Sequence, residues 1–321
     1  MKARQRAKEQ PAPGVDWAVT VERAATKDVR RLLRVVRRRR RGRWFAGGLI
    51  VLAVGAVVTL LVRSSLFAPV VGDPVAEGTE QVGSGAQLDL ARPFAATPAA
   101  DWADGAAGIT LPEAEPVGGF SAEQVADATA LARDALVASR VDERMLSRHD
   151  PAGYLGLLAP DARRQLEPLF GGGREPEVQS LVSMAAAGTE LLPVAPKVSG
   201  SMSVRTGDAG ELVVHTNYVF AYAFRPAGPT KLVDAMNVIV VVRADVDYVL
   251  RSGDRWTPGS RGLWFGDASG FGYSIGCDAY QKGFLAPVAA EPSVTAPADD
   301  RDPGAFFDPS APLPAGGGCR A

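Results

Sequence analysis

The strongest constraint on this chain is an uncharged apolar stretch near its N-terminus. It runs from Trp44 to Val62, and none of its nineteen residues carries a charged side chain. As an α-helix the stretch would be about 28 Å long, close to the roughly 30 Å hydrocarbon thickness of a bilayer. A core helix of a soluble protein is rarely uncharged over such a length. The stretch therefore predicts one transmembrane helix, residues 44–62.

A cleaved signal peptide is the main alternative to a permanent anchor. Such a peptide has a charged leader, an apolar part and then a small-residue cleavage site. Here forty-three residues precede the apolar stretch, and cleavage after Ala68 would put Leu66 where a small side chain is needed. We therefore expect an uncleaved single-pass anchor.

The charge distribution predicts how the anchor is oriented. Residues 1–43 hold fifteen Lys or Arg against four Asp or Glu, a net charge of +11, whereas the whole chain carries −1 and residues 44–321 therefore −12. Basic flanks of membrane helices stay in the cytoplasm. We expect a cell-membrane protein with a cytoplasmic N-terminus and an extracytoplasmic C-terminal part. The residues expected to fix this orientation are Arg37, Arg38, Arg39, Arg40, Arg41 and Arg43.

The basic cytoplasmic tail, residues 1–43, also has a helical pattern. Apolar residues recur at three- or four-residue steps and so define one face of a helix; they are Trp17, Val21, Ala25, Val29, Leu32 and Val36. A basic amphipathic helix beside a membrane binds anionic lipid. The alternative is that the arginines only set the orientation. No nucleic-acid recognition motif accompanies the charge, so no nucleic-acid partner is expected.

Beyond the anchor, composition and periodicity predict a linker and then an α+β domain. Residues 63–119 are rich in Ala, Gly and Pro, which indicates an extended linker, although aromatic residues such as Phe94 and Trp102 could hold part of it on the domain. Residues 120–285 begin with helical patterns, the first with a capping box from Ser121 to Gln124, and we expect four helices, the last over 175–188. After Pro196 the period changes to two, which predicts long antiparallel strands with one buried face. The expected fold is helices packed on a curved antiparallel sheet.

The two cysteines predict a disulfide that ties back a proline-rich tail, residues 286–321. Cys277 stands at the expected end of the last strand, and Cys319 is third from the end of the chain. Disulfides persist outside the cytoplasm, and closing a loop of this length would contribute on the order of 4 kcal/mol. Two free thiols are the alternative, since a tetrahedral metal site would need more ligands.

Residues that could support chemistry are few. His215 and Asn217 lie on the less apolar face of one strand, while Asp245 and Asp247 share a face of the next. These four are weak candidates for a ligand site, because paired carboxylates can move protons or hold a cation. Arg243 is on the same face, which favours a solvated, salt-bridged surface. Phosphate-loop, nucleophile-elbow and zinc-protease motifs are missing from the sequence, so no catalytic residue, cofactor or metal is expected.

The order of elements resembles a known superfamily. Helices followed by LVVHTNYVFAYAF, NVIVVVRADVDYVLRSGDRW and a final aromatic strand are similar to the nuclear-transport-factor-like cone of the ketosteroid isomerase superfamily, over about residues 120–285. The whole chain, with ARPFAATPAADWADGAAG and LAPDARRQLEPLFGGGREPEVQSLVS, resembles uncharacterised single-pass membrane proteins of actinobacteria. Isomerases of the cone superfamily carry a pocket acid on the inner face, where this chain has aromatic and aliphatic residues.

These features favour a membrane-anchored, non-enzymatic interaction or scaffold domain of the cell envelope. Its expected partners are the lipid bilayer, with anionic lipid at the basic tail, and an envelope protein. Two alternatives stay open. One is a small-ligand-binding or cone-type enzyme domain, which needs polar groups inside the cone. The other is an accessory component of a secretion or envelope complex.

Overall fold

The computed structural model describes residues 88–226, 234–290 and 303–313. The apolar stretch Trp44–Val62, the basic tail and Cys319 lie outside these ranges. Among the residues that are described, no helix has both the length and the apolar character needed to cross a bilayer.

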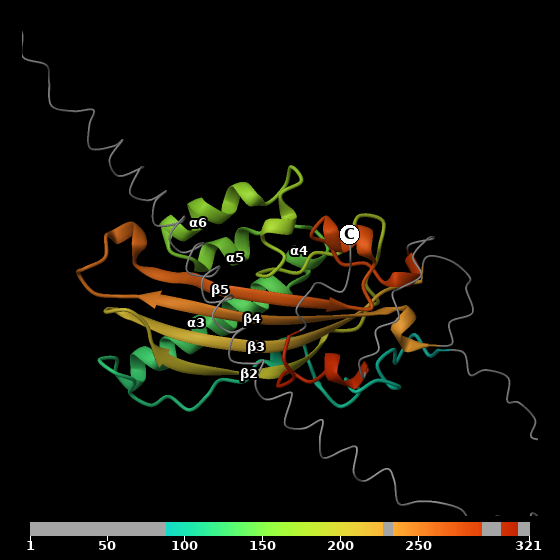
Figure 1. Cartoon of the computed structure of the whole chain (residues 1–321), viewed down its shortest axis with the longest axis horizontal. Coiled ribbons are helices and arrows are strands. Elements are labelled where there is room, and N and C mark those ends of the chain that lie inside the picture. The colour runs from blue at the N-terminus through green and yellow to red at the C-terminus, as the bar shows by residue number, and fades with distance from the viewer. Residues whose placement is uncertain (1–87, 227–233, 291–302, 314–321) are drawn as a thin grey trace, which may run out of the picture. The chain divides into compact units, whose positions relative to one another are not determined.

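The described part is built on one antiparallel sheet (Figure 1). Its five strands lie in chain order, each paired with the next. They are β1 (Ala103–Asp104), β2 (Lys197–Thr206), β3 (Glu211–Ala223), β4 (Ile239–Arg251) and β5 (Gly262–Tyr273). The expected antiparallel sheet is therefore confirmed, and the long strands follow from alternating sequences rich in β-branched and aromatic residues.

Helices precede the long strands, as the sequence predicts, and give an α+β fold. They are α3 (Ala122–Arg140), α4 (Glu143–Leu146), α5 (Ala152–Leu157) and α6 (Pro160–Leu166), with α7 (Cys277–Gln281) following the sheet. The expected capping box starts α3, because the Ser121 hydroxyl accepts from the Gln124 amide and the Gln124 side chain accepts from the Ser121 amide. Figure 1 shows α3 running behind the strands.

Two of the expected elements differ from the structure. Residues 175–188 form only a short 3₁₀ turn, Glu175–Glu177, followed by loop. The Arg140 side chain takes backbone carbonyls of this loop as acceptors, which removes them from helical hydrogen bonding. The last strand ends at Tyr273, and Cys277 opens α7 instead of closing the strand.

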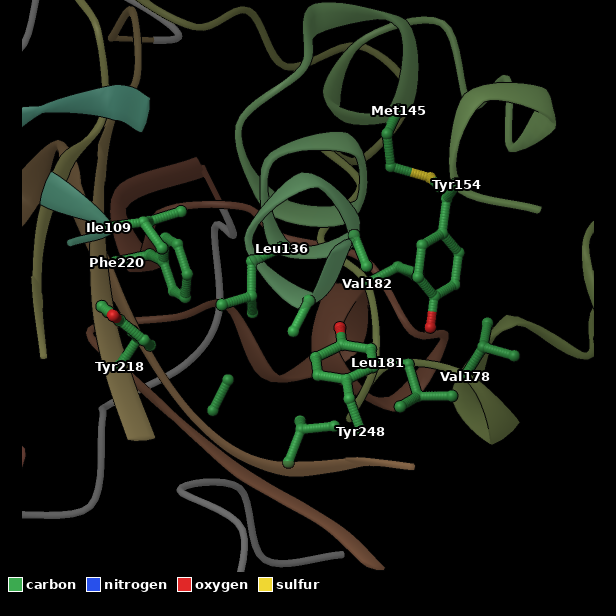
Figure 2. Packing of buried hydrophobic residues seen from close by; sticks show 14 of the residues in the cluster. Ile109, Leu136, Met145, Tyr154, Val178, Leu181, Val182, Tyr218, Phe220 and Tyr248 are labelled. Carbon is green, nitrogen blue, oxygen red and sulfur yellow. The ribbon is translucent and has the colours of Figure 1, made fainter. Parts of the chain in front are cut away.

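The main core lies between the helices and one face of the sheet, here called the helix-covered face. Alternate residues of β3 and β4 point into it, and Figure 2 shows Phe220 and Tyr248 of these strands with Leu136 of α3. All three side chains are fully or almost fully buried. Thr216, the polar residue of this face of β3, donates its hydroxyl to the Val246 carbonyl at 2.9 Å. Aromatic and aliphatic packing therefore fills this face along most of its length.

The other face of the sheet is here called the outer face. It is buried at one end, whereas the sequence predicted a sheet with only one buried face. Val219, Ala221 and Val241 form a second cluster there with Phe94 and Phe307. Phe94 comes from the expected linker, so residues 88–119 pack on the domain, and β1 of the same segment pairs with β2. The sequence of β3 and β4 near this end is apolar on both sides, which is the mark of a strand buried on both faces.

Candidate functional site

A polar cluster occupies the open end of the outer face. His215 of β3 lies directly opposite Asp247 of β4, and its Nδ1 is 3.0 Å from an Asp247 carboxylate oxygen. The second Asp247 oxygen accepts a hydrogen bond from Arg205 of β2 at 2.6 Å. Asp245, two residues back on β4, is 3.6 Å from the same histidine nitrogen. Three neighbouring strands therefore place these groups together, because residues at two-residue spacing share a face.

The cluster lines an open hollow of about 400 Å³. Its walls come from β2 to β5, and the lining residues are Ser203, Arg205, His215, Asp245, Asp247 and Asp267. Three aspartates stand against one arginine, so the hollow has a net negative formal charge with the histidine either neutral or protonated. The hollow thus offers carboxylate acceptors to a positively charged group.

The environment of Asp245 disfavours the ionised form of its carboxylate. Partial burial raises its pKa above the ordinary value of 3.8, the nearby Asp247 charge raises it further, and His215 and Arg243 act in the opposite direction. A raised pKa means that the ionised carboxylate is poorly solvated in the fold. A cation that binds in the hollow would stabilise the ionised Asp245 carboxylate.

The outer face also holds another part of the chain, a 3₁₀ turn at Pro303–Phe306 and the turns that follow it. Residues 303–313 lie beside the polar cluster, and the Pro309 carbonyl accepts from both Asn217 and Arg243, each at 2.7 Å. Phe306 stacks on Tyr273 with ring centroids 4.0 Å apart. Two hydrogen bonds to one backbone carbonyl and one aromatic contact therefore hold this C-terminal segment on the outer face.

The four weak ligand-site candidates from the sequence all lie on the outer face, but they divide into two groups. His215, Asp245 and Asp247 line the hollow, whereas Asn217 binds the C-terminal segment. Sequence reasoning missed Arg205 and Asp267, which reach the hollow from the flanking strands. Whether these two residues reach the hollow depends on the register between strands. The alternation of polar and apolar residues within a single strand does not reveal that register.

The side chains in the hollow are suited mainly to binding a charged partner. Within the described ranges, no group of three or more His, Cys, Asp or Glu side chains is arranged to hold a metal ion. Ser203 pairs with His215 across β2 and β3, but no hydrogen bond joins these two described side chains, and a serine nucleophile needs such a bond to its base. The His215–Asp247 pair is bound instead to Arg205, as in a salt-bridged surface.

The other predicted site residues are six arginines near the N-terminus and the two cysteines. The six arginines Arg37, Arg38, Arg39, Arg40, Arg41 and Arg43 are outside the described ranges. Cys277 is not a free thiol, but Cys319 also lies outside those ranges, so its pairing with Cys277 stays a prediction.

No protein-family model, curated protein or solved structure matches this chain. The resemblance to the nuclear-transport-factor-like cone therefore stays an expectation that is based on the sequence pattern.

Proposed function

We propose that this protein is a membrane-anchored interaction domain of the cell envelope that binds a basic, extended segment of a partner protein in the hollow of its outer sheet face. In this proposal the Trp44–Val62 helix anchors the chain, and residues 1–43 stay in the cytoplasm beside anionic lipid. The domain then lies outside the membrane, and it acts by binding rather than by catalysis.

One observation carries the proposal: the outer face already binds a separate segment of its own chain. Asn217 and Arg243 donate to the Pro309 carbonyl, and Phe306 stacks on Tyr273. A backbone carbonyl and an aromatic side chain are groups that a segment of another protein also offers. The adjoining hollow continues this face beyond the bound segment.

The charge of the hollow specifies the chemistry of the partner. Asp245, Asp247 and Asp267 present more negative charge than Arg205 neutralises. A segment bearing Arg or Lys would pair with these carboxylates, and Arg offers a planar fork that suits them. We therefore commit to a basic segment as the occupant.

The two alternative functions relate differently to this surface. An accessory component of a secretion or envelope complex would use the same hollow and would differ only in the identity of its partner. A cone-type enzyme domain would need acid–base groups on the helix-covered face, whereas His215 and both cluster aspartates of β4 are on the outer face. The geometry therefore supports binding of a protein segment best.

A titration with a basic peptide tests the proposal. The full chain, purified in mild detergent, is mixed with a short dye-labelled peptide in which Arg alternates with Ser, and fluorescence anisotropy reports binding. Replacing Asp245 and Asp267 with Asn removes two charges from the hollow but keeps the Asp247 contacts with His215 and Arg205. Because exposed ion pairs contribute little each, we expect binding to weaken about fivefold to tenfold.

The matched control removes two charges elsewhere. Asp127 and Asp134 are exposed on α3, and their replacement by Asn changes the net charge by the same amount. This variant should bind the peptide as the unmodified protein does. Equal weakening in both double variants would mean that the peptide responds to overall charge, and the hollow would lose its assigned role.

A further inference from the structure

Arg140, the last residue of α3, is a buried cation whose acceptors are all neutral. Its side chain is 1% exposed. Nη1 donates to the Val182 carbonyl at 2.9 Å and to the Ser183 hydroxyl at 3.0 Å, and Nη2 donates to the Ser180 carbonyl at 2.6 Å. In the part of the chain that the structure describes, no carboxylate accepts a hydrogen bond from this guanidinium.

Such a position is unfavourable for a charge. Burial lowers the pKa of the Arg140 guanidinium, and the neighbouring Tyr222 acts in the opposite direction, yet an arginine stays protonated in proteins. Carbonyl dipoles and the negative end of α3 replace only part of the hydration that a buried cation loses. An anion bound beside the guanidinium would compensate for the remaining loss of hydration.

A cavity of about 80 Å³ adjoins this cation on the helix-covered face. Polar groups from Arg140, Gln179 and Ser180 line one side. Within the described structure, the Arg140 Nε and the Gln179 Oε1 are both buried without a hydrogen-bond partner. Anchoring of the 179–183 loop explains the other arginine contacts, but it leaves the Nε donor without a partner among the described residues.

Residues of the sheet form part of the cavity wall. They include Gly270 of β5, which lies opposite Ala244, and Val242 of β4. Other apolar side chains of the wall come from Val182, Phe284 and Leu285. The space therefore has one cationic end and an apolar body.

We propose that this cavity binds a small monocarboxylate, with its carboxylate at the Arg140 end and the short alkyl chain packing against Val242 and its apolar neighbours. The cavity exceeds the roughly 30 Å³ that one water takes in the liquid, and ions of acetate to butyrate size suit it. An arginine is well fitted to a carboxylate because its N–H groups are fixed in a plane. The site is independent of the docking hollow, which lies on the opposite face.

Ligand-induced stabilisation tests this proposal. The thermal midpoint of the full chain in detergent is followed during titration with sodium propionate, with propionamide as the neutral isostere and sodium chloride as the salt control. A ligand that binds only the folded state raises the midpoint in a saturable way. We expect such a rise with propionate alone. No saturable rise, or an equal rise with propionamide or chloride, would overturn the proposal.

A cavity-filling variant separates this site from any other. Val242→Leu narrows the space while Arg140 stays in place, and we expect it to weaken the apparent affinity for propionate at least tenfold. Val246→Leu is the matched control, since Val246 is buried on the same face of β4 but does not line the cavity. An undiminished propionate response in Val242→Leu would place the binding elsewhere and contradict the assignment.

Discussion

Asp245 illustrates how single residues acquire their properties from neighbouring strands. Its sequence position predicts only that it shares a face with Asp247. The structure adds His215 at 3.6 Å from its carboxylate and partial burial, which is the largest cause of its raised pKa. The ionised carboxylate is thus less favourable in the folded chain than in the unfolded one.

The linkage between pKa and stability fixes the sign of a testable effect. The pKa of Asp245 in the folded chain lies above 3.8. The fold therefore favours the protonated carboxyl, and this contribution to the free energy of unfolding is lost as the pH rises through the folded pKa. Asp245→Asn should therefore increase the free energy of unfolding at neutral pH, by less than about 1 kcal/mol given solvent screening. The gain should vanish below the unfolded pKa, at about pH 3.

Denaturant unfolding at both pH values measures this difference. Asp267→Asn serves as the control, because Asp267 is exposed in the same hollow and its replacement should change stability by less than about 0.5 kcal/mol. A loss of stability in Asp245→Asn at neutral pH would show that its ionised form is favoured by the fold.

At the scale of elements, α3 connects the sequence to the core most directly. Its capping box was predicted from Ser121 and Gln124, and both reciprocal hydrogen bonds are present. Val125, Ala128 and Ala132, which follow one another at three- and four-residue steps, are buried. Local pattern and tertiary packing agree in this helix, which is why it could be predicted well.

Removal of the cap gives a prediction for this element. Ser121→Ala leaves the Gln124 amide without its side-chain acceptor, and N-cap substitutions of this kind cost about 1 kcal/mol. Ser147→Ala, at an exposed position after α4, should have little effect. Chemical denaturation of both variants compares them, and an equal loss of stability would show that the capping box contributes nothing.

Elements that depend on distant contacts were predicted less well. Residues 175–188 have a helical apolar pattern, but Arg140, far away in sequence, binds the carbonyls of Ser180 and Val182. The Arg140 cavity likewise depends on the pairing of β4 with β5. The sequence identified His215, Asp245 and Asp247 through alternation alone, whereas Arg205 and Asp267 required the register of the sheet.

At the scale of the whole molecule, the two faces of the sheet have different roles. The helix-covered face contains the main core and the Arg140 cavity. The outer face is covered at one end by residues 88–102 and 303–313, and its other end is the acidic hollow. We propose that a Cys277–Cys319 disulfide ties down the tail beyond residue 313, as the two cysteines predict. A partner segment would then continue the outer face beyond the bound C-terminal segment.

Site-specific photo-cross-linking in living cells tests the central proposal most directly. A photoreactive phenylalanine derivative replaces Ser203, which is exposed in the hollow, or Asp134, which is exposed on α3, in the full chain. We predict one major adduct from position 203 and none from position 134, with the cross-linked segment rich in Arg or Lys and belonging to an extracytoplasmic part of an envelope protein. Equal adducts from both positions, an acidic segment, or a cytoplasmic partner would contradict the proposed docking surface.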